Sequence, residues 1–244
     1  MKFFNSPFAV GSQFLQDQLY VTPNDMYQRL SGKMEVRSNE GIATVLASIE
    51  PGQTLQLAPD TWTYNGTLVI DKSCSIVGHP LGTKIKRGEG LTSGPLVSIE
   101  ADNVILKNIY FEDNTDLSPI QCVNTSSANT FISECTFVTW AKALVNDGGN
   151  GSVFSFNVVS ATSVGADFNQ TSSGHRIIGN SVTMTPDTGT SIGLDSQVTA
   201  TAIVANNCNA KITFHNTGLA QTFAAPGGSS NHVSGNVAAL TETT

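Results

Sequence analysis

The sequence has little charge, and positive charge is its scarcest component. Charged residues make up 13% of the 244 residues, with 12 Lys and Arg against 19 Asp and Glu, for a formal net charge of −7. The cations that lie beyond residue 88 are Lys107, Lys142, Arg176 and Lys211. An acidic chain of this kind repels phosphate backbones and acidic polysaccharides, so we expect no nucleic-acid partner.

Long apolar runs and metal-binding spacings are also missing. No stretch approaches the roughly 18 apolar residues of a membrane-spanning helix, so we expect no membrane partner. The four cysteines are Cys74, Cys122, Cys135 and Cys208. Their wide spacing matches no metal or redox motif, which indicates buried free thiols rather than disulfides. We therefore expect no metal site and no cofactor.

We also expect no signal peptide. The apolar start of the chain is interrupted by Asn5, Ser6 and Pro7, and no small-residue cleavage site follows. We therefore expect synthesis in a cytoplasm without secretion.

From Thr54 onward, short alternating apolar runs are separated by Gly, Asn, Asp and Ser, and these runs repeat. The repeats align on Asn108, Glu134, Asn157, Asn180, Asn206 and Asn236, with spacings of 26, 23, 23, 26 and 30 residues. A second strand precedes each of the first five aligned positions, at 96–100, 120–124, 144–147, 166–169 and 192–195. A period of this size with two or three strands per unit is typical of one coil of a parallel β-helix.

The recurring asparagine fits a corner of such a coil. Asparagine tolerates left-handed backbone geometry, and the same residue on successive coils could form an amide ladder. The alternative is a β-sandwich with strands every 8 to 12 residues, which explains the strands but not the repeated motif.

The first 50 residues differ from this pattern. Residues 1–40 lack periodicity and carry aromatic side chains that we expect to dock on another protein or to support oligomerisation: Phe3, Phe4, Phe8, Phe14 and Tyr20. Ile42, Val45, Leu46 and Ile49 then share one helix face, so a helix is predicted within 41–50, with Asn39 or Ser38 as its cap. This helix would cover the open end of the core of a solenoid that spans 41–244.

The first coil resembles the opening of the pectate-lyase-like superfamily of right-handed parallel β-helices. Its matching segments are Pro51-Gly52-Gln53-Thr54, the alternating apolar residues that follow, and Leu68-Val69-Ile70-Asp71-Lys72-Ser73 through Ile76-Val77-Gly78. Asp60 stands where the family usually has glycine. The resemblance covers about 30 residues and implies an all-β, single-stranded right-handed parallel β-helix. It leaves function open, because that superfamily includes lyases, hydrolases, phage tailspikes and inert scaffolds.

Catalytic groups are sparse along the coils. The densest acidic group, Glu112, Asp113 and Asp116, follows a predicted strand and could bind Ca²⁺ or supply the two carboxylates of a glycoside hydrolase. Acidic turns between strands are common, however, and the cations that a lyase would need are largely missing. The four histidines are scattered singly, without a nucleophile signature around them.

These features predict a non-enzymatic structural protein of a bacteriophage virion. We expect a homotrimer, exposed as a capsid decoration knob or a short tail fibre or spike, whose 1–40 arm docks on capsid or tail proteins. Trimerisation follows from resemblance to phage β-helices and from symmetry. The alternatives are a tailspike depolymerase that cleaves polysaccharide as a lyase or hydrolase, and a non-catalytic adhesin that binds a host surface glycan.

Overall fold

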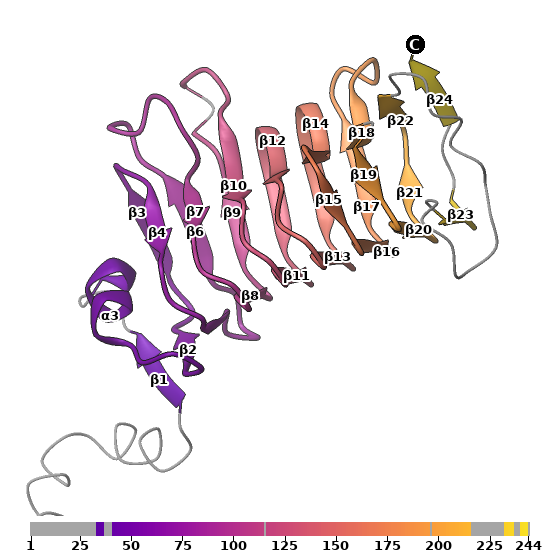
Figure 1. Ribbon diagram of the computed structural model, residues 1–244. Helices are drawn as coiled ribbons and strands as arrows, with labels where there is room; N and C mark the ends of the chain where they lie inside the picture. The colour runs from indigo at the N-terminus through magenta and orange to yellow at the C-terminus, as the bar shows by residue number, and fades with distance from the viewer. Residues whose placement is uncertain are drawn as a thin grey trace, which may run out of the picture.

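The chain folds into one parallel β-solenoid, which confirms the fold predicted from the repeat. The computed structural model describes residues 33–36, 41–114, 116–195, 197–215, 232–236 and 240–243. Coils stack along one axis, from α3 (Ile42–Ser48) at one end to β24 (Leu240–Thr243) at the other (Figure 1). Each strand pairs in parallel with the equivalent strand of the next coil, as β5 does with β8 and β11 with β13.

The coils build three walls. The first wall is a nine-stranded sheet of β1 (Lys33–Val36), β2 (Thr54–Leu57), β5 (Ser75–Val77), β8 (Ile105–Lys107), β11 (Phe131–Ser133), β13 (Val153–Ser155), β16 (Arg176–Ile178), β20 (Ala202–Val204) and β23 (His232–Ser234). The second wall consists of β3 (Thr61–Tyr64), β6 (Lys84–Arg87), β9 (Tyr110–Glu112), the first parts of β12 (Thr136–Asp147) and β14 (Val158–Asn169), β17 (Ser181–Met184) and β21 (Asn207–Cys208).

The third wall continues from the second. It consists of β4 (Leu68–Ile70), β7 (Val97–Ile99), β10 (Gln121–Thr125), the later parts of β12 and β14, β18 (Thr190–Leu194), β22 (Lys211–His215) and β24. Because β12 and β14 run through the corner with a register shift, the second and third walls form one 13-stranded sheet. Short strands β15 (Ser172–Ser173) and β19 (Val198–Thr199) pair in the segments that return from the third wall to the first.

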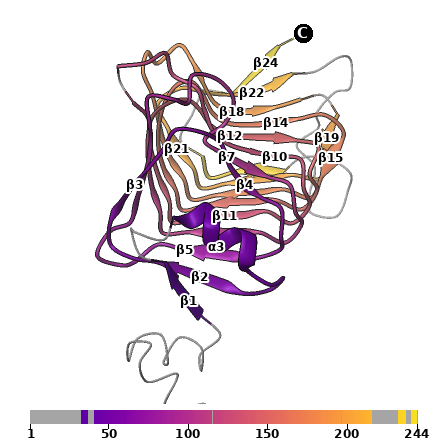
Figure 2. The same cartoon turned by 90° about the vertical axis from the view of Figure 1, so that its left-hand side faces the viewer.

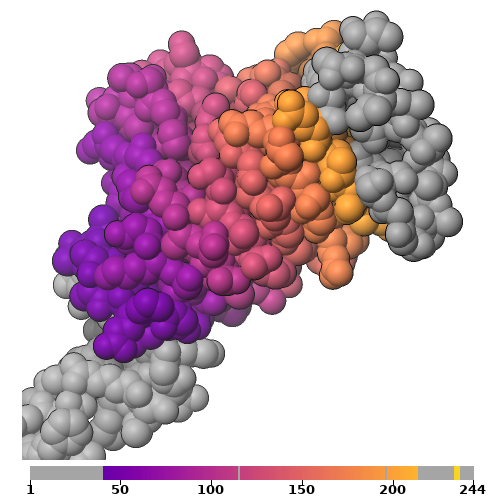
Figure 3. Space-filling view, viewed as in Figure 1, coloured from indigo at the N-terminus to yellow at the C-terminus, as the bar shows by residue number. Residues whose placement is uncertain are grey.

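Inside the solenoid, apolar side chains stack on their equivalents in neighbouring coils. The inward row of the first wall contains Leu55, Ile76, Leu106, Ile132, Phe154, Ile177 and Ile203, each at most 1% exposed. The rings of Phe111 and Phe137 stack with centroids 5.1 Å apart. Burial of one such side chain contributes about 2 kcal/mol, so each coil gains stability only where its neighbours cover it. The space-filling view shows this order, with segments following one another along the body in chain order (Figure 3).

The predicted helix covers the end of the core, as Figure 2 shows. Ile42, Val45 and Leu46 of α3 are buried. The expected cap at Asn39 or Ser38 is wrong, because the N-cap residue is Gly41 with φ 72° and no side chain caps the helix. Instead, the solenoid itself satisfies the first turn, since the backbone N–H of Ile42 donates to the Tyr64 hydroxyl at 2.9 Å.

An asparagine ladder runs along the corner between the first and second walls. Asn157, Asn180 and Asn206 are each 1% exposed, and their amides donate to Oδ1 of the next asparagine, ending at Asn236. The second N–H of each amide donates to a backbone carbonyl of the preceding coil, as from Asn180 to Phe154 at 2.8 Å. The predicted amide ladder is therefore confirmed in these four coils.

The predicted corner conformation is wrong for the same four residues. Asn108 and Glu134 do have left-handed backbones, with φ of 55° and 56°, but in later coils this conformation belongs to the preceding residue. Those preceding residues are Phe156, Gly179, Ala205 and Gly235. The alignment on residue type thus slipped by one position between Glu134 and Asn157. Asparagine suits both the turning position and the buried position after it, so residue type alone does not separate them.

The first strand of the solenoid lies inside the segment assigned to the N-terminal arm. Residues 33–36 form β1, which pairs in parallel with β2 at the edge of the first wall. The aromatic residues Phe3, Phe4, Phe8, Phe14 and Tyr20 lie outside the described residues. No helix in the described part of the chain is long and apolar enough to cross a membrane.

Candidate functional site

The acidic turn predicted as a possible site begins at the end of β9, where Glu112 projects outward from the second wall. Its carboxylate lies 2.6 Å from Lys84 Nζ and 3.3 Å from Lys86 Nζ, both on the neighbouring strand β6. The hydrogen bond from Lys84 is the largest cause that lowers the pKa of Glu112, and the same bond raises the pKa of Lys84. Glu112 is therefore held as a carboxylate between two ammonium groups.

Asp113 lies in a different environment, although it is the next residue. Its side chain and that of Arg87 are each 1% exposed, and Oδ1 of Asp113 lies 2.8 Å from an Arg87 guanidinium nitrogen. Asp113 also accepts the backbone N–H groups of Asn114 and Ile120, while Arg87 donates to the carbonyls of Leu91 and Ser118. This buried ion pair ties together the loops that follow β6 and β9.

Asp116 contributes to neither of these clusters in the described contacts. Its backbone N–H donates to the Asn114 side chain at 3.1 Å, and its side chain borders a surface hollow. Glu112, Asp113 and Asp116 thus face three different surroundings. Within the part of the chain that the structure describes, no group of three His, Cys, Asp or Glu residues is arranged to hold a metal ion.

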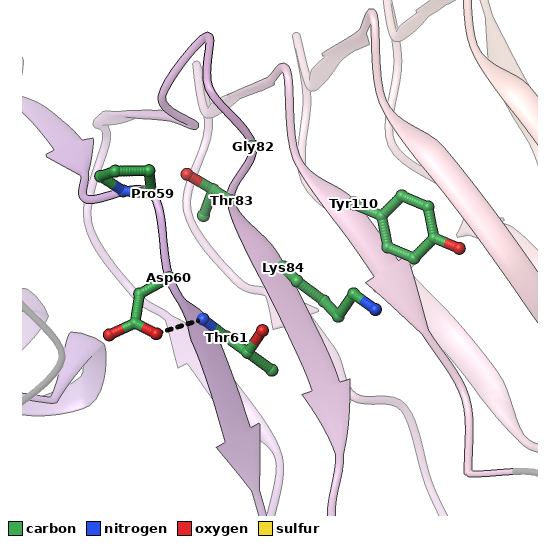
Figure 4. A pocket seen from close by; sticks show the side chains of 7 residues that line it. All are labelled: Pro59, Asp60, Thr61, Gly82, Thr83, Lys84 and Tyr110. Carbon is green, nitrogen blue, oxygen red and sulfur yellow. Dashed lines mark hydrogen bonds between the residues drawn. The ribbon is translucent and has the colours of Figure 1, made fainter.

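Two shallow hollows flank this region of the second wall. The first has a volume of about 370 Å³ and is lined by Pro59, Asp60, Thr61, Gly82, Thr83, Lys84 and Tyr110 (Figure 4). Lys84 Nζ lies 4.9 Å from the centroid of the Tyr110 ring, in a cation–π contact. The second hollow, about 440 Å³, is lined by Thr63, Asn65, Lys86, Arg87, Gly88, Glu89, Asn114 and Asp116. Because Lys84 and Lys86 alternate with buried residues on β6, both hollows open on the outer face of the second wall.

A polar stripe on the third wall was missed at the sequence level. Both carboxylate oxygens of Asp147 accept amide hydrogens, one from Asn124 at 3.2 Å and one from Asn169 at 3.1 Å. Nearby, Lys142 Nζ lies 2.7 Å from the carboxylate of Asp167. The strand segments before each aligned corner carry Asn124, Asp147 and Asn169 near their ends, so aligning those segments would have revealed the stripe.

The polar stripe brings two carboxylates to one wall. Asp147 pairs in register with Asn169, two residues after Asp167 on the same strand, so the backbones of the two aspartates are about 8 Å apart. A glycoside hydrolase needs two carboxyl groups close to one another, so this pair is a candidate catalytic pair. Asp167, however, is 8% exposed and bonded to Lys142, and both oxygens of Asp147 are occupied by amides.

The four cysteines and His175 belong to the core. All four cysteines are free and buried, which confirms the expectation of free thiols. Burial raises the pKa of the Cys74 thiol to about 11 and that of Cys135 to about 12, so these thiols stay protonated. His175 is 1% exposed, packs its ring 4.8 Å from that of Phe168, and has its pKa lowered to about 4 by burial.

No family model matches this chain, no curated protein is significantly similar to it, and no solved structure matches it significantly. The parallel β-solenoid is therefore established by the arrangement of its own coils. The resemblance to pectate-lyase-like proteins continues to rest on the residues of the first coil.

Proposed function

We propose that this chain is a non-enzymatic structural protein of a bacteriophage virion. It would act as a homotrimer, displayed on the particle as a capsid decoration knob or as a short tail fibre or spike. The observation that carries the proposal is the state of the predicted acidic site, where Glu112 and Asp113 are both committed to ion pairs within the fold.

These ion pairs argue against acid–base chemistry at the acidic turn. A general acid must carry a proton at the working pH, whereas the Lys84 contact lowers the pKa of Glu112. Asp113 is buried, and its contacts with Arg87 and two backbone N–H groups give it a role in loop closure. Both residues therefore fit a scaffold better than a hydrolase.

The architecture of the solenoid also suits a protein that is displayed on the surface of a particle. Backbone groups are tied to the coils on either side, side chains stack in rows, and exposed charge is low. Such a body resists local opening, which proteases require before they cleave. A protein displayed on a particle outside a cell needs this resistance.

The polarity of the solenoid fits anchoring by the N-terminal segment. β1 and α3 lie at one end of the body, and β24 lies at the other (Figure 1). Attachment through the 1–40 arm, with its aromatic residues, would leave the coils projecting from a capsid or tail. The virion location, the trimer and the capsid or tail partners all belong to this proposal.

A glycan-binding adhesin is the second candidate, and the first hollow favours it. Tyr110 supplies an aromatic ring, Lys84 lies beside it on the neighbouring strand, and Asp60 and Thr61 add hydrogen-bonding groups on the other side of Lys84 (Figure 4). Sites for sugars commonly combine an apolar surface with a few polar groups. Because Lys84 and Lys86 share Glu112 and Asp60 lies close by, the charges largely compensate. An uncharged oligosaccharide therefore suits the hollow better than an acidic one.

Catalysis is tested by incubating the purified full chain with a panel of bacterial surface polysaccharides. Reducing ends and unsaturated sugars are then measured, and we expect neither to form. Turnover that Glu112→Gln or Asp147→Asn abolishes, while the exposed control Asp187→Asn retains it, would overturn the structural proposal in favour of a depolymerase.

Binding without turnover separates the adhesin from the inert scaffold. Neutral oligosaccharides released from the same polysaccharides would be titrated against the chain by calorimetry. If the adhesin reading holds, Tyr110→Ala weakens binding about tenfold, the effect of losing roughly 1.4 kcal/mol. The control Val138→Ala on the same wall should leave binding unchanged. If no sugar produces a heat of binding, the adhesin is ruled out and the scaffold function is the one that remains.

A further inference from the structure

The outer face of the first wall carries an apolar strip. Ile105, Phe131 and Val153 lie side by side in register on β8, β11 and β13 and point outward. Ile178 and Val204 are paired in a parallel row two residues further along the strands, on β16 and β20. Phe156 follows at the adjoining corner. We call these six residues the apolar strip. Phe131 is 40% exposed and Phe156 is 63% exposed, so both rings reach solvent.

Among the described residues of the other two walls, exposed large apolar side chains occur singly, as Val158 does on the second wall and Val69 on the third. The outer face of the second wall carries Lys84, Lys86 and Glu112, and that of the third wall carries Lys142 and Asp147. Apolar side chains arranged in rows on one outer face are informative, because a single exposed apolar residue is normal while a contiguous patch usually marks an interaction surface.

Phe156 is poorly suited to its position by the needs of the fold. Its backbone is left-handed, with φ 55°, at a corner that other coils fill with the smaller or polar residues Asn108, Glu134, Gly179, Ala205 and Gly235. A bulky residue is unusual in this conformation. The ring lies against Gly179 of the next coil, where an added Cβ would come within 2.7 Å of the phenyl group. The fold accommodates an exposed ring here without burying it, which points to a role outside the monomer.

We infer that the apolar strip is the surface on which a second copy of this chain docks; this inference rests on the proposed homotrimer and names its contact. Rows on any copy repeat with the same spacing of about 4.8 Å, so side chains of two copies can interdigitate along their whole length. A partner that is not built from stacked strands would lack this matching period.

Charge favours the same occupant. The chain carries a net charge of −7, so two copies repel unless they meet where carboxylates are few. On the first wall, Glu134 is paired with Lys107 at 3.1 Å, and Arg176 is exposed beside Val153. The strip is thus a neutral to basic surface on an acidic molecule.

Sedimentation velocity of the full chain over a range of concentrations tests the inference. We expect a trimer for the wild type and at least tenfold weaker association for Phe131→Asp and Phe156→Asp. Leu81→Asp and Val69→Asp serve as matched controls, because these residues are 82% and 43% exposed and lie away from the strip. Both controls should associate like the wild type. Arg176→Glu should weaken association as well.

Phe156→Asn guards against loss of folding. Asparagine occupies the same left-handed corner at Asn108, so this variant removes the ring while keeping a suitable backbone. We expect unchanged circular dichroism and weaker association. A wild type that stays monomeric overturns the homotrimer itself. A wild-type trimer that none of the strip variants weakens overturns the strip as its contact and leaves the homotrimer in place.

Discussion

The side chain of Asn180 hydrogen-bonds to the coils on both sides of it. Its amide nitrogen donates to Oδ1 of Asn206 at 2.9 Å and to the carbonyl of Phe154 at 2.8 Å. Its own Oδ1 accepts the backbone N–H and the side-chain amide of Asn157. One buried side chain therefore joins three consecutive coils at the corner.

Replacing Asn180 should destabilise the solenoid strongly. Asn180→Ala leaves the backbone N–H and amide of Asn157 without their acceptor in a buried corner, and each orphaned group costs about 1–3 kcal/mol. We expect a loss of about 3 kcal/mol in the free energy of unfolding, measured by urea denaturation. Asn207→Ala is the matched control, because Asn207 is exposed on the next coil and should change stability by less than about 0.5 kcal/mol. Equal losses for both variants would contradict the role of the ladder.

Removing one partner of the buried ion pair between Arg87 and Asp113 should strongly destabilise the protein. Asp113→Ala leaves the Arg87 guanidinium buried without a counter-ion, which costs about 3–5 kcal/mol. The control is Glu134→Ala, which breaks an exposed ion pair, because the side chains of Lys107 and Glu134 are 45% and 51% exposed. This variant should lower the free energy of unfolding by less than about 1 kcal/mol. Thermal unfolding of the two variants checks the contrast. A small loss for Asp113→Ala would mean that water or another group solvates Arg87.

Acid should destabilise the protein through His175. Burial lowers its pKa from 6.5 to about 4, so between these values the unfolded chain binds a proton that the folded chain does not. The stability that depends on a neutral His175 is fully present above pH 6.5. It falls as the pH drops towards 4, by about 3 kcal/mol in total.

Urea unfolding at a series of pH values measures this slope. His175→Leu should flatten the dependence between pH 4 and 6.5, although its stability at neutral pH also reflects the lost contact with Ser172. Below pH 4.5, Glu112 adds a second loss in both proteins, because its lowered pKa makes its ion pairs contribute above that range. An unchanged slope in His175→Leu would assign the effect to other groups.

Gly78 marks a close approach between coils. A Cβ at this position would lie 1.9 Å from the backbone carbonyl oxygen of Asn108 in the next coil. We therefore expect Gly78→Ala to cost about 3 kcal/mol or to shift the coil, since the obstacle is backbone. Gly66→Ala is the control, because nothing lies within 4 Å of its added Cβ. Melting temperatures that drop equally in both variants would contradict this steric account.

The sequence was sufficient to predict the solenoid because its signals are local and repeated. The alternation of apolar residues sets the walls, and Ile42, Val45 and Leu46 mark the covering helix by spacing alone. The helix cap was not predictable in the same way. It depends on the Tyr64 hydroxyl, which lies 22 residues along the chain from Ile42.

At the candidate sites, too, contacts between residues far apart in the sequence could not be predicted. Asp113 looks like any residue of an acidic turn until Arg87, 26 residues earlier, is placed beside it by the coil length. The polar stripe was within reach of the sequence, since Asn124, Asp147 and Asn169 occur near the ends of successive strand segments. The sequence does not show that these side chains contact one another, because the contacts depend on how the strands pair between coils.

Because of the asparagine ladder, the solenoid can gain or lose whole coils. Each asparagine presents Oδ1 to the preceding coil, as Asn157 does to the backbone of Cys135 and Asn180 does to Asn157. Deleting 23 residues that run from one ladder position to the next would place Asn180 opposite Cys135 with the same groups facing. Evolution can thus shorten or lengthen the reach of the molecule by about 4.8 Å at a time without redesigning its interior.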